Sequence, residues 1–252
     1  MLARRPRQCA CTARRLQGGT RHRLRPGPRQ RLDLYLPDSM GPGTPLVVFF
    51  YGGRWQAGRK EDFLFAAEAF VSRGFAVAVP DTRLYPEVRF PVFLQDAAAA
   101  VAWLARKGAR HRLPAEGGPV VLAGHSSGAH IATMLALDER WLAAAGAPRP
   151  AGLLGLAVPY DFLPLRDADL RDIFHADRAP AGLPATQPIV HADPGDPPAA
   201  LASAGARRRY PPTGRFPRQG RSSSNNRAGA PRAASSRRTC QTRIVGRATM
   251  PM

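Results

Sequence analysis

Hydrophobic positions alternate between two periods through the centre of the chain. Strand-like patterns occur in five short runs, of which the first alternates and the others are almost wholly apolar: 31–36, 46–50, 75–79, 119–123 and 153–158. Between them lie three segments with apolar residues at helical spacing: 61–72, 91–107 and 127–137. Apolar strands that alternate with amphipathic helices predict an α/β fold with a doubly wound, mostly parallel sheet.

The charge of the chain is distributed very unevenly. The 252 residues include 37 Lys and Arg against 18 Asp and Glu, a formal net charge of +19. Residues 1–32 contain ten Arg and residues 201–252 contain twelve, and neither end has an acid. Residues 33–200 therefore hold the other 15 basic residues and all 18 acidic ones. We therefore expect disordered Arg-rich tails at 1–25 and 201–252 around an α/β core at 26–200. Since the core itself is not basic, we expect no specific nucleic-acid partner.

Cysteine usage and hydropathy limit the other classes. All three cysteines, Cys9, Cys11 and Cys240, lie in the tails, so the core has no Cys-based metal site. The longest apolar stretch, 97–105, is about half of what a membrane span needs. We expect a cytoplasmic protein with no metal, and nothing in the sequence indicates its oligomeric state.

Residues 124–128 read Gly-His-Ser-Ser-Gly and lie between a predicted strand and a predicted helix. A G-x-S-x-G sequence in that context is typical of a nucleophile elbow, where small flanking residues permit a sharp turn that exposes the serine. Ser126 is the candidate nucleophile, and the amide of Ser127 is a candidate oxyanion-hole donor. The alternative is a chance match in a chain rich in Gly and Ala.

A second oxyanion donor is expected in the loop after an earlier central strand, where Gly52 and Gly53 follow Tyr51. Their amides can approach a substrate oxygen closely because glycine has no side chain. The alternative is an ordinary glycine turn. We expect Trp55 to pack beneath this loop more readily than to touch substrate.

The chain resembles the α/β-hydrolase serine esterases of the carboxylesterase, feruloyl-esterase-like and kynurenine-formamidase-like group, over roughly residues 26–199. The resemblance is carried by residues 51–55 (Tyr-Gly-Gly-Arg-Trp), 81–86 (Asp-Thr-Arg-Leu-Tyr-Pro), 90–91 (Phe-Pro), 124–130 (Gly-His-Ser-Ser-Gly-Ala-His) and 160–162 (Tyr-Asp-Phe). Most relatives have His-Gly-Gly where this chain has Tyr51. The resemblance implies hydrolysis of small-molecule carboxylic esters, or less readily amides, without a cofactor.

The resemblance also implies a triad Asp after the seventh strand and a triad His after the eighth, and the sequence lacks both. No acid and no histidine occurs from residue 197 onward. Asp193 and Asp196 precede the expected strand, and Asp161 is a weaker candidate for the acid.

The remaining candidates are expected to line the site or to be structural. Residues that could line the site are Tyr51, Trp55, His125, Tyr160 and Asp161. Because His130 lies within the helix behind the elbow, we expect it to be structural, and packing or surface roles are expected for His175 and His191.

Loss of apolar periodicity and of all acids near residue 200 suggests a shifted reading frame there. We hypothesise that 201–252, and the segment before about residue 26, are out of frame. The chain would then lack its last strands, expose the edge of 153–158 and be an impaired hydrolase. The alternative is a natural basic tail on a non-catalytic protein that binds polyanions.

Overall fold

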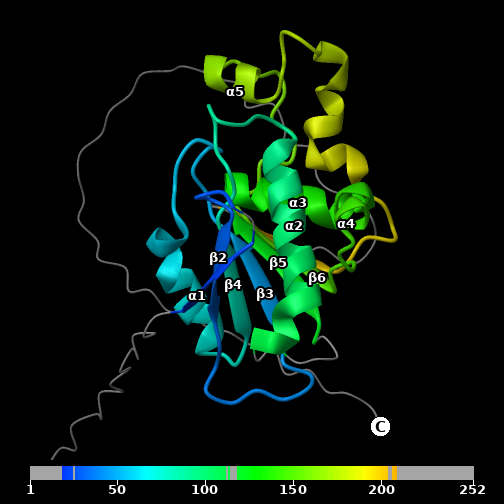
Figure 1. The fold of residues 1–252 in the computed structure, drawn as a ribbon. Helices are drawn as coiled ribbons and strands as arrows, with labels where there is room; N and C mark the ends of the chain where they lie inside the picture. The colour runs from blue at the N-terminus through cyan, green and yellow to red at the C-terminus, as the bar shows by residue number, and fades with distance from the viewer. Residues whose placement is uncertain (1–18, 25, 112, 114–117, 204–205, 209–252) are drawn as a thin grey trace, which may run out of the picture. The chain divides into compact units, whose positions relative to one another are not determined.

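An eight-stranded sheet forms the centre of the computed structural model (Figure 1). The structure describes residues 19–24, 26–111, 113, 118–203 and 206–208. All of them belong to one compact unit, residues 1–218, and the second unit, 219–252, lies outside the described residues.

The sheet has the spatial order β1-β2-β4-β3-β5-β6-β7-β8. Its strands are β1 (Thr20–Arg23), β2 (Arg31–Tyr35), β3 (Leu46–Phe50), β4 (Ala76–Pro80), β5 (Val120–His125), β6 (Gly152–Leu156), β7 (Ala199–Ser203) and β8 (Ala206–Arg208). The five strands from β4 to β7 in this order are parallel, and β1, β2 and β8 add antiparallel pairs at the two edges. The predicted fold class is confirmed.

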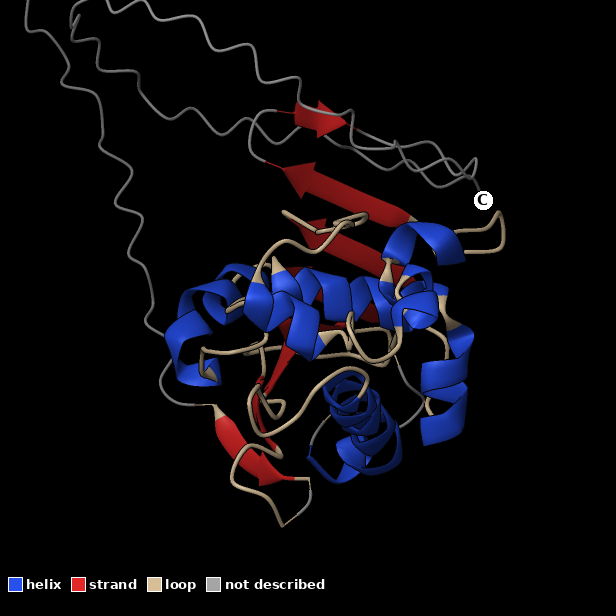
Figure 2. Cartoon of the chain, turned by 90° about the horizontal axis from the view of Figure 1, so that it is seen from above, coloured by secondary structure: helices blue, strands red, loops and turns tan. Residues whose placement is uncertain are grey.

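Helices lie on both faces of this sheet (Figure 2). They are α1 (Leu64–Val71), α2 (Val92–Lys107), α3 (Ser127–Leu137), α4 (Glu139–Ala145) and α5 (Ala168–Ile173). Short 3₁₀ helices span Lys60–Phe63, Gly108–His111, Pro180–Gly182, Pro184–Thr186 and Pro188–His191. Helix α1 packs on β3 and β4, and α3 packs on β3, β5 and β6 and against α2.

The central strand β3 shows why its sequence is apolar at every position. Leu46, Val48 and Phe50 belong to the core cluster under α2 and α3, whereas Val47 and Phe49 belong to the cluster under α1. Successive side chains of a strand point to opposite faces, so a strand covered by helices on both sides buries all of them.

The ordered sheet extends past both expected limits of the core. We expected the core to span 26–200. Strand β1, however, lies in the first expected tail and pairs with β2, and β7 and β8 continue the sheet to Arg208. Backbone pairing needs no apolar side chains, which is why a pattern of Thr, Arg and His in β1 did not predict a strand. The remaining parts of the predicted tails, 1–18 and 209–252, lie outside the described residues.

Strand β6 is not at the edge of the sheet, contrary to the expected exposed edge at 153–158. The amide of Leu153 donates to Pro198 O at 2.9 Å, and the amide of Ala157 donates to Ala202 O at 2.7 Å. Leu201 of β7 also packs against the main core cluster. Leu201 is the one large apolar side chain of β7, and it therefore helps to hold this strand against the sheet.

We predict that Leu201→Asp detaches β7, because it places a charge against the apolar core. Amide exchange at Leu153 and Ala157 should accelerate about tenfold or more, as expected for local opening. Hydrogen exchange read by NMR measures this, with Ser203→Asp on the same strand as the control, since Ser203 is exposed. Equal exchange in the two variants would contradict the pairing.

Candidate active site

Ser126 lies at the sharp turn between β5 and α3. Its backbone has φ 52° and ψ −120°, a conformation that residues other than glycine rarely adopt. The turn is held from both sides: the Ser126 amide donates to Leu156 O at 2.8 Å, and its carbonyl accepts from the His130 amide at 3.0 Å. A strained residue so firmly held is typical of a functional site.

Glycine is required on both sides of this turn because backbone passes directly against it. A Cβ on Gly128 would lie 2.1 Å from Phe50 O and 2.3 Å from Tyr51 O, and one on Gly124 would lie 2.4 Å from Gly128 O. These separations are far below any real contact. The two glycines therefore let α3 approach the end of β3, where the glycine loop begins.

The glycine loop after β3, residues 51–58, lies beside Ser126. A Cβ on Gly52 would be 3.2 Å from Ser126 Cβ and 2.8 Å from His125 Nδ1. The structure thus brings together Gly52 and Ser126. Gly53 differs from the expectation, because its amide donates to the Ser127 hydroxyl at 3.0 Å and is thereby occupied within the protein.

Trp55 belongs to the glycine loop, and its side chain is buried, with 6% of its surface exposed. Its ring packs edge-on to His130 at 5.1 Å and to Phe174 at 5.0 Å, and stacks with Phe162 at 5.9 Å. Phe162 and Phe174 belong to the segment that follows β6. This aromatic cluster connects the glycine loop, α3 and that segment in one apolar contact.

His130 is fully buried in this cluster, as expected for a structural residue. Its Nε2 donates to Thr186 O at 2.9 Å. Burial lowers the pKa of His130 from its ordinary value to about 4, because the charged imidazolium loses its hydration there. The side chain is therefore neutral near pH 7.

Three other described histidines lie in different surroundings. His175 Nε2 bonds to Phe90 O at 2.9 Å, and His191 Nε2 bonds to Ala185 O at 2.8 Å. His125 precedes Ser126 and is exposed. Within the described part of the chain, the Ser126 hydroxyl forms no hydrogen bond to an imidazole.

The candidate residues after β6 lie in a segment that backbone hydrogen bonds connect to residues 187–189. Tyr160 accepts a hydrogen bond at its carbonyl from the Ile189 amide at 3.1 Å, and the neighbouring Phe162 amide donates to Gln187 Oε1 at 2.9 Å. Asp161 is partly exposed. Roles for Tyr160 and Asp161 in lining the site stay predictions.

Helix α5 is tied to the glycine loop by polar pairs that the sequence did not indicate. Arg54 Nη2 donates to Asp167 at 2.8 Å, and Gln56 Nε2 donates to Asp169 at 2.8 Å. These partners are 113 residues apart in sequence, so only the fold brings them together. Helix α5, which follows the strand beside the elbow, is thus anchored to the loop at Arg54 and Gln56.

Two absences among the described residues bear on the type of site. No group of three or more His, Cys, Asp or Glu side chains is arranged to hold a metal ion among them. No helix within the same residues is long and apolar enough to cross a membrane. A cytoplasmic location stays a prediction.

The sheet order and the flanking helices define the class: the chain has the α/β-hydrolase fold. A solved structure of esterase 2 from Thermogutta terrifontis shares this fold with a TM-score of 0.58 at 21% identity, covering 74% of this chain and 71% of that one. A candidate thioesterase of Silicibacter sp. TM1040 has a TM-score of 0.58 at 30% identity, covering 75% of this chain and 66% of that one.

Sequence comparison refines the class. The BD-FAE family model matches residues 32–143. Kynurenine formamidase of Danio rerio is 29% identical over 136 residues, which cover 54% of this chain and 44% of the relative. An isoprenylcysteine alpha-carbonyl methylesterase of Arabidopsis thaliana is 33% identical over 115 residues, covering 44% of this chain and 26% of the relative.

Over these matched residues the chain is similar to α/β-hydrolase esterases. The matched segment contains both the glycine loop and the elbow. The chain spans less than half the length of the curated relatives it matches, 44% of the first and 45% of the second.

We predict that Gly128→Ala destabilises the protein by about 3 kcal/mol or more, because the new methyl group collides with two carbonyl oxygens. Urea unfolding measures the change. Gly182→Ala is the matched control, since a Cβ there meets nothing within 4 Å, and it should change stability by less than about 0.5 kcal/mol. A similar effect of both substitutions would show that the elbow is not tightly packed.

We also predict a specific pH dependence from His130. Its pKa is about 4 in the folded protein and about 6.5 when unfolded, so its contribution to stability is complete above pH 6.5. As the pH falls toward 4, the unfolded state takes up a proton that the folded state refuses. The free energy of unfolding should then fall by about 3 kcal/mol in total.

Urea unfolding between pH 7 and 4.5 measures this slope. His130→Gln keeps a donor for Thr186 O and cannot titrate, so its slope over the same range should be clearly smaller. Parallel slopes for wild type and His130→Gln would show that His130 is not the group that titrates.

Proposed function

We propose that the protein is a serine hydrolase of carboxylic esters with Ser126 as its nucleophile. The observation that carries this proposal is the backbone of Ser126, held at φ 52° at the end of β5 with Gly52 packed beside it. The turn exposes the Ser126 hydroxyl next to a loop in which glycines leave the backbone amides uncovered. The hydroxyl can then attack a carbonyl carbon while the carbonyl oxygen faces those amides.

The amides best placed to receive the developing negative charge belong to Gly52 and Ser127. Ser127 is the first residue of α3, so its amide lies at the positive end of an eleven-residue helix. The Gly53 amide, which we expected as a third donor, instead supports the Ser127 hydroxyl. Fixed donors aimed at an oxyanion are commonly the largest source of acceleration in acyl transfer.

Esters are favoured over amides by the relatives. Among the curated relatives, several are named methylesterases and one from Mycobacterium tuberculosis is named carboxylesterase, against two named kynurenine formamidases. We therefore propose a small-molecule carboxylic ester as substrate. Helix α5 is bound to the loop through Arg54 and Gln56, and we propose that it limits which substrates reach Ser126.

Catalysis in this chain should be slow. A serine hydroxyl needs a base to attack efficiently, and the chain has no histidine and no acid after Asp196, where the resemblance to serine esterases requires both. Loss of a triad base costs roughly 10⁶ in kcat, whereas an oxyanion hole and substrate binding alone retain roughly 10³ to 10⁴ over water. We propose a hydrolase whose site can bind and polarise an ester but turns it over poorly.

A fluorophosphonate probe tests this proposal. We predict covalent labelling of the full chain at Ser126, located by peptide mass spectrometry, and loss of labelling in Ser126→Ala. Ser72→Ala, at an exposed serine remote from the elbow in sequence, should label like wild type. Absence of labelling after long incubation, or labelling that persists in Ser126→Ala, would refute the proposed nucleophile.

A further inference from the structure

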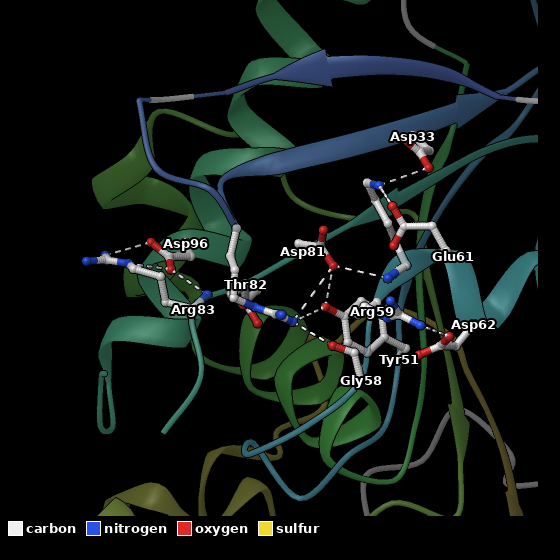
Figure 3. A network of polar contacts seen from close by, with 12 residues as sticks. Asp33, Tyr51, Gly58, Arg59, Glu61, Asp62, Asp81, Thr82, Arg83 and Asp96 are labelled. Atoms are coloured by element: carbon white, nitrogen blue, oxygen red, sulfur yellow. Dashed lines mark hydrogen bonds and ion pairs between the residues drawn. The ribbon is translucent and has the colours of Figure 1, made fainter. Parts of the chain in front are cut away.

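A buried polar cluster holds the glycine loop at Tyr51 and Gly58 (Figure 3). Tyr51, the residue before the two glycines, has 7% of its surface exposed. Its hydroxyl donates to Asp81 Oδ1 at 2.5 Å and accepts from Arg29 Nη2 at 2.9 Å. The hydroxyl is therefore committed to protein partners behind the loop.

Arg29 contacts the loop at both of its ends. Besides Tyr51, its Nη2 donates to Gly58 O at 2.6 Å, and its Nε donates to Thr82 O at 2.9 Å. Arg29 belongs to the connection before β2, so it joins three segments that are distant in sequence. Each of these bonds is charge-assisted, and the two to Gly58 and Thr82 end on backbone carbonyls.

Asp81 completes the cluster from the end of β4. Only 8% of its surface is exposed, and the oxygen that accepts from Tyr51 also accepts from the Lys60 amide at 3.1 Å. Arg29 Nη2 lies 3.9 Å from the same oxygen. Residues 51, 58 and 60 are thus all tied to one Arg and Asp pair, and the backbone that carries Gly52 and Gly53 is fixed at its start and at its end.

A tethered loop matters here because Gly52 packs directly against Ser126. A displacement of about 1 Å in a group that positions a reacting atom can cost on the order of 100-fold in rate. Burial, and next the Asp81 carboxylate, raise the pKa of Tyr51 above its ordinary value, so its hydroxyl keeps the proton that it donates.

We propose that Tyr51, Arg29 and Asp81 are positioning residues that fix the glycine loop for the oxyanion at Ser126. This inference rests on the proposed function for its catalytic consequence, but the tether itself is a property of the loop. Tyr51 acts together with Arg29, which belongs to the connection before β2.

Tyr51→Phe tests the tether by removing one hydroxyl. Amide exchange of the peptide covering 52–58, read by mass spectrometry on the full chain, should accelerate about tenfold. Fluorophosphonate labelling of Ser126 should slow roughly 10- to 100-fold at saturating probe. The displaced Gly52 amide would stabilise the transition state less, whereas it contributes little to the encounter complex.

Tyr35→Phe is the matched control. Tyr35 is equally buried, with 7% exposed, and its hydroxyl also donates to an aspartate, Asp33 Oδ2, at 3.5 Å. It lies on β2, and its hydroxyl bonds to Asp33 rather than to a residue of the glycine loop. We expect both readouts to stay within about twofold of wild type in this variant.

The outcomes separate the tether from the proposed function. Unchanged exchange at 52–58 in Tyr51→Phe overturns the tether, and faster exchange with unchanged labelling overturns the positioning role. If wild type itself does not label, the proposed function fails, and exchange alone decides on the tether. Should Tyr51→Phe not fold, Arg29→Lys is measured in the same way, since lysine keeps the charge but cannot bond Thr82, Tyr51 and Gly58 together.

Discussion

Close packing of α3 against the end of β3 is the constraint on which the site depends. Gly128 leaves no room for even a methyl group beside the carbonyls of Phe50 and Tyr51. That contact sets the angle at which the chain leaves β5, and so it holds Ser126 in its strained conformation. The same two carbonyls lie where β3 passes into the glycine loop, so a single contact aligns Ser126 with the loop beside it.

The polar groups around this contact divide into two sets with different tasks. Behind the loop, Asp81 and Arg29 hold it through buried, charge-assisted bonds. Above it, Arg54 pairs with Asp167 through side chains that are both about half exposed, so water and salt weaken that pair. The loop is therefore rigid toward the core and only loosely bound toward α5.

Strongly periodic elements could be predicted from the sequence, and weakly periodic ones could not. The strand at 46–50 and the helix at 127–137 have the predicted bounds, because both are buried on more than one side and leave a clear apolar pattern. Helix α5, with residues Ala-Asp-Leu-Arg-Asp-Ile, is only six residues long and half polar, so it leaves no clear period in the sequence. It is stabilised by Asp167 at its N-terminus and by ion pairs whose partners no local pattern reveals.

The candidate site was predictable in part for the same reason. Gly52, Ser126 and Ser127 follow from local turn chemistry, whereas the engagement of Gly53 by Ser127 and the role of Arg29 depend on contacts between distant segments. A crystal structure of the phosphonylated full chain would test the central claim most directly. The account predicts a phosphorus atom bonded to Ser126 Oγ with one oxygen about 2.7–3.1 Å from the amides of Gly52 and Ser127. A phosphonyl oxygen turned away from both amides, or an unmodified Ser126, would contradict it.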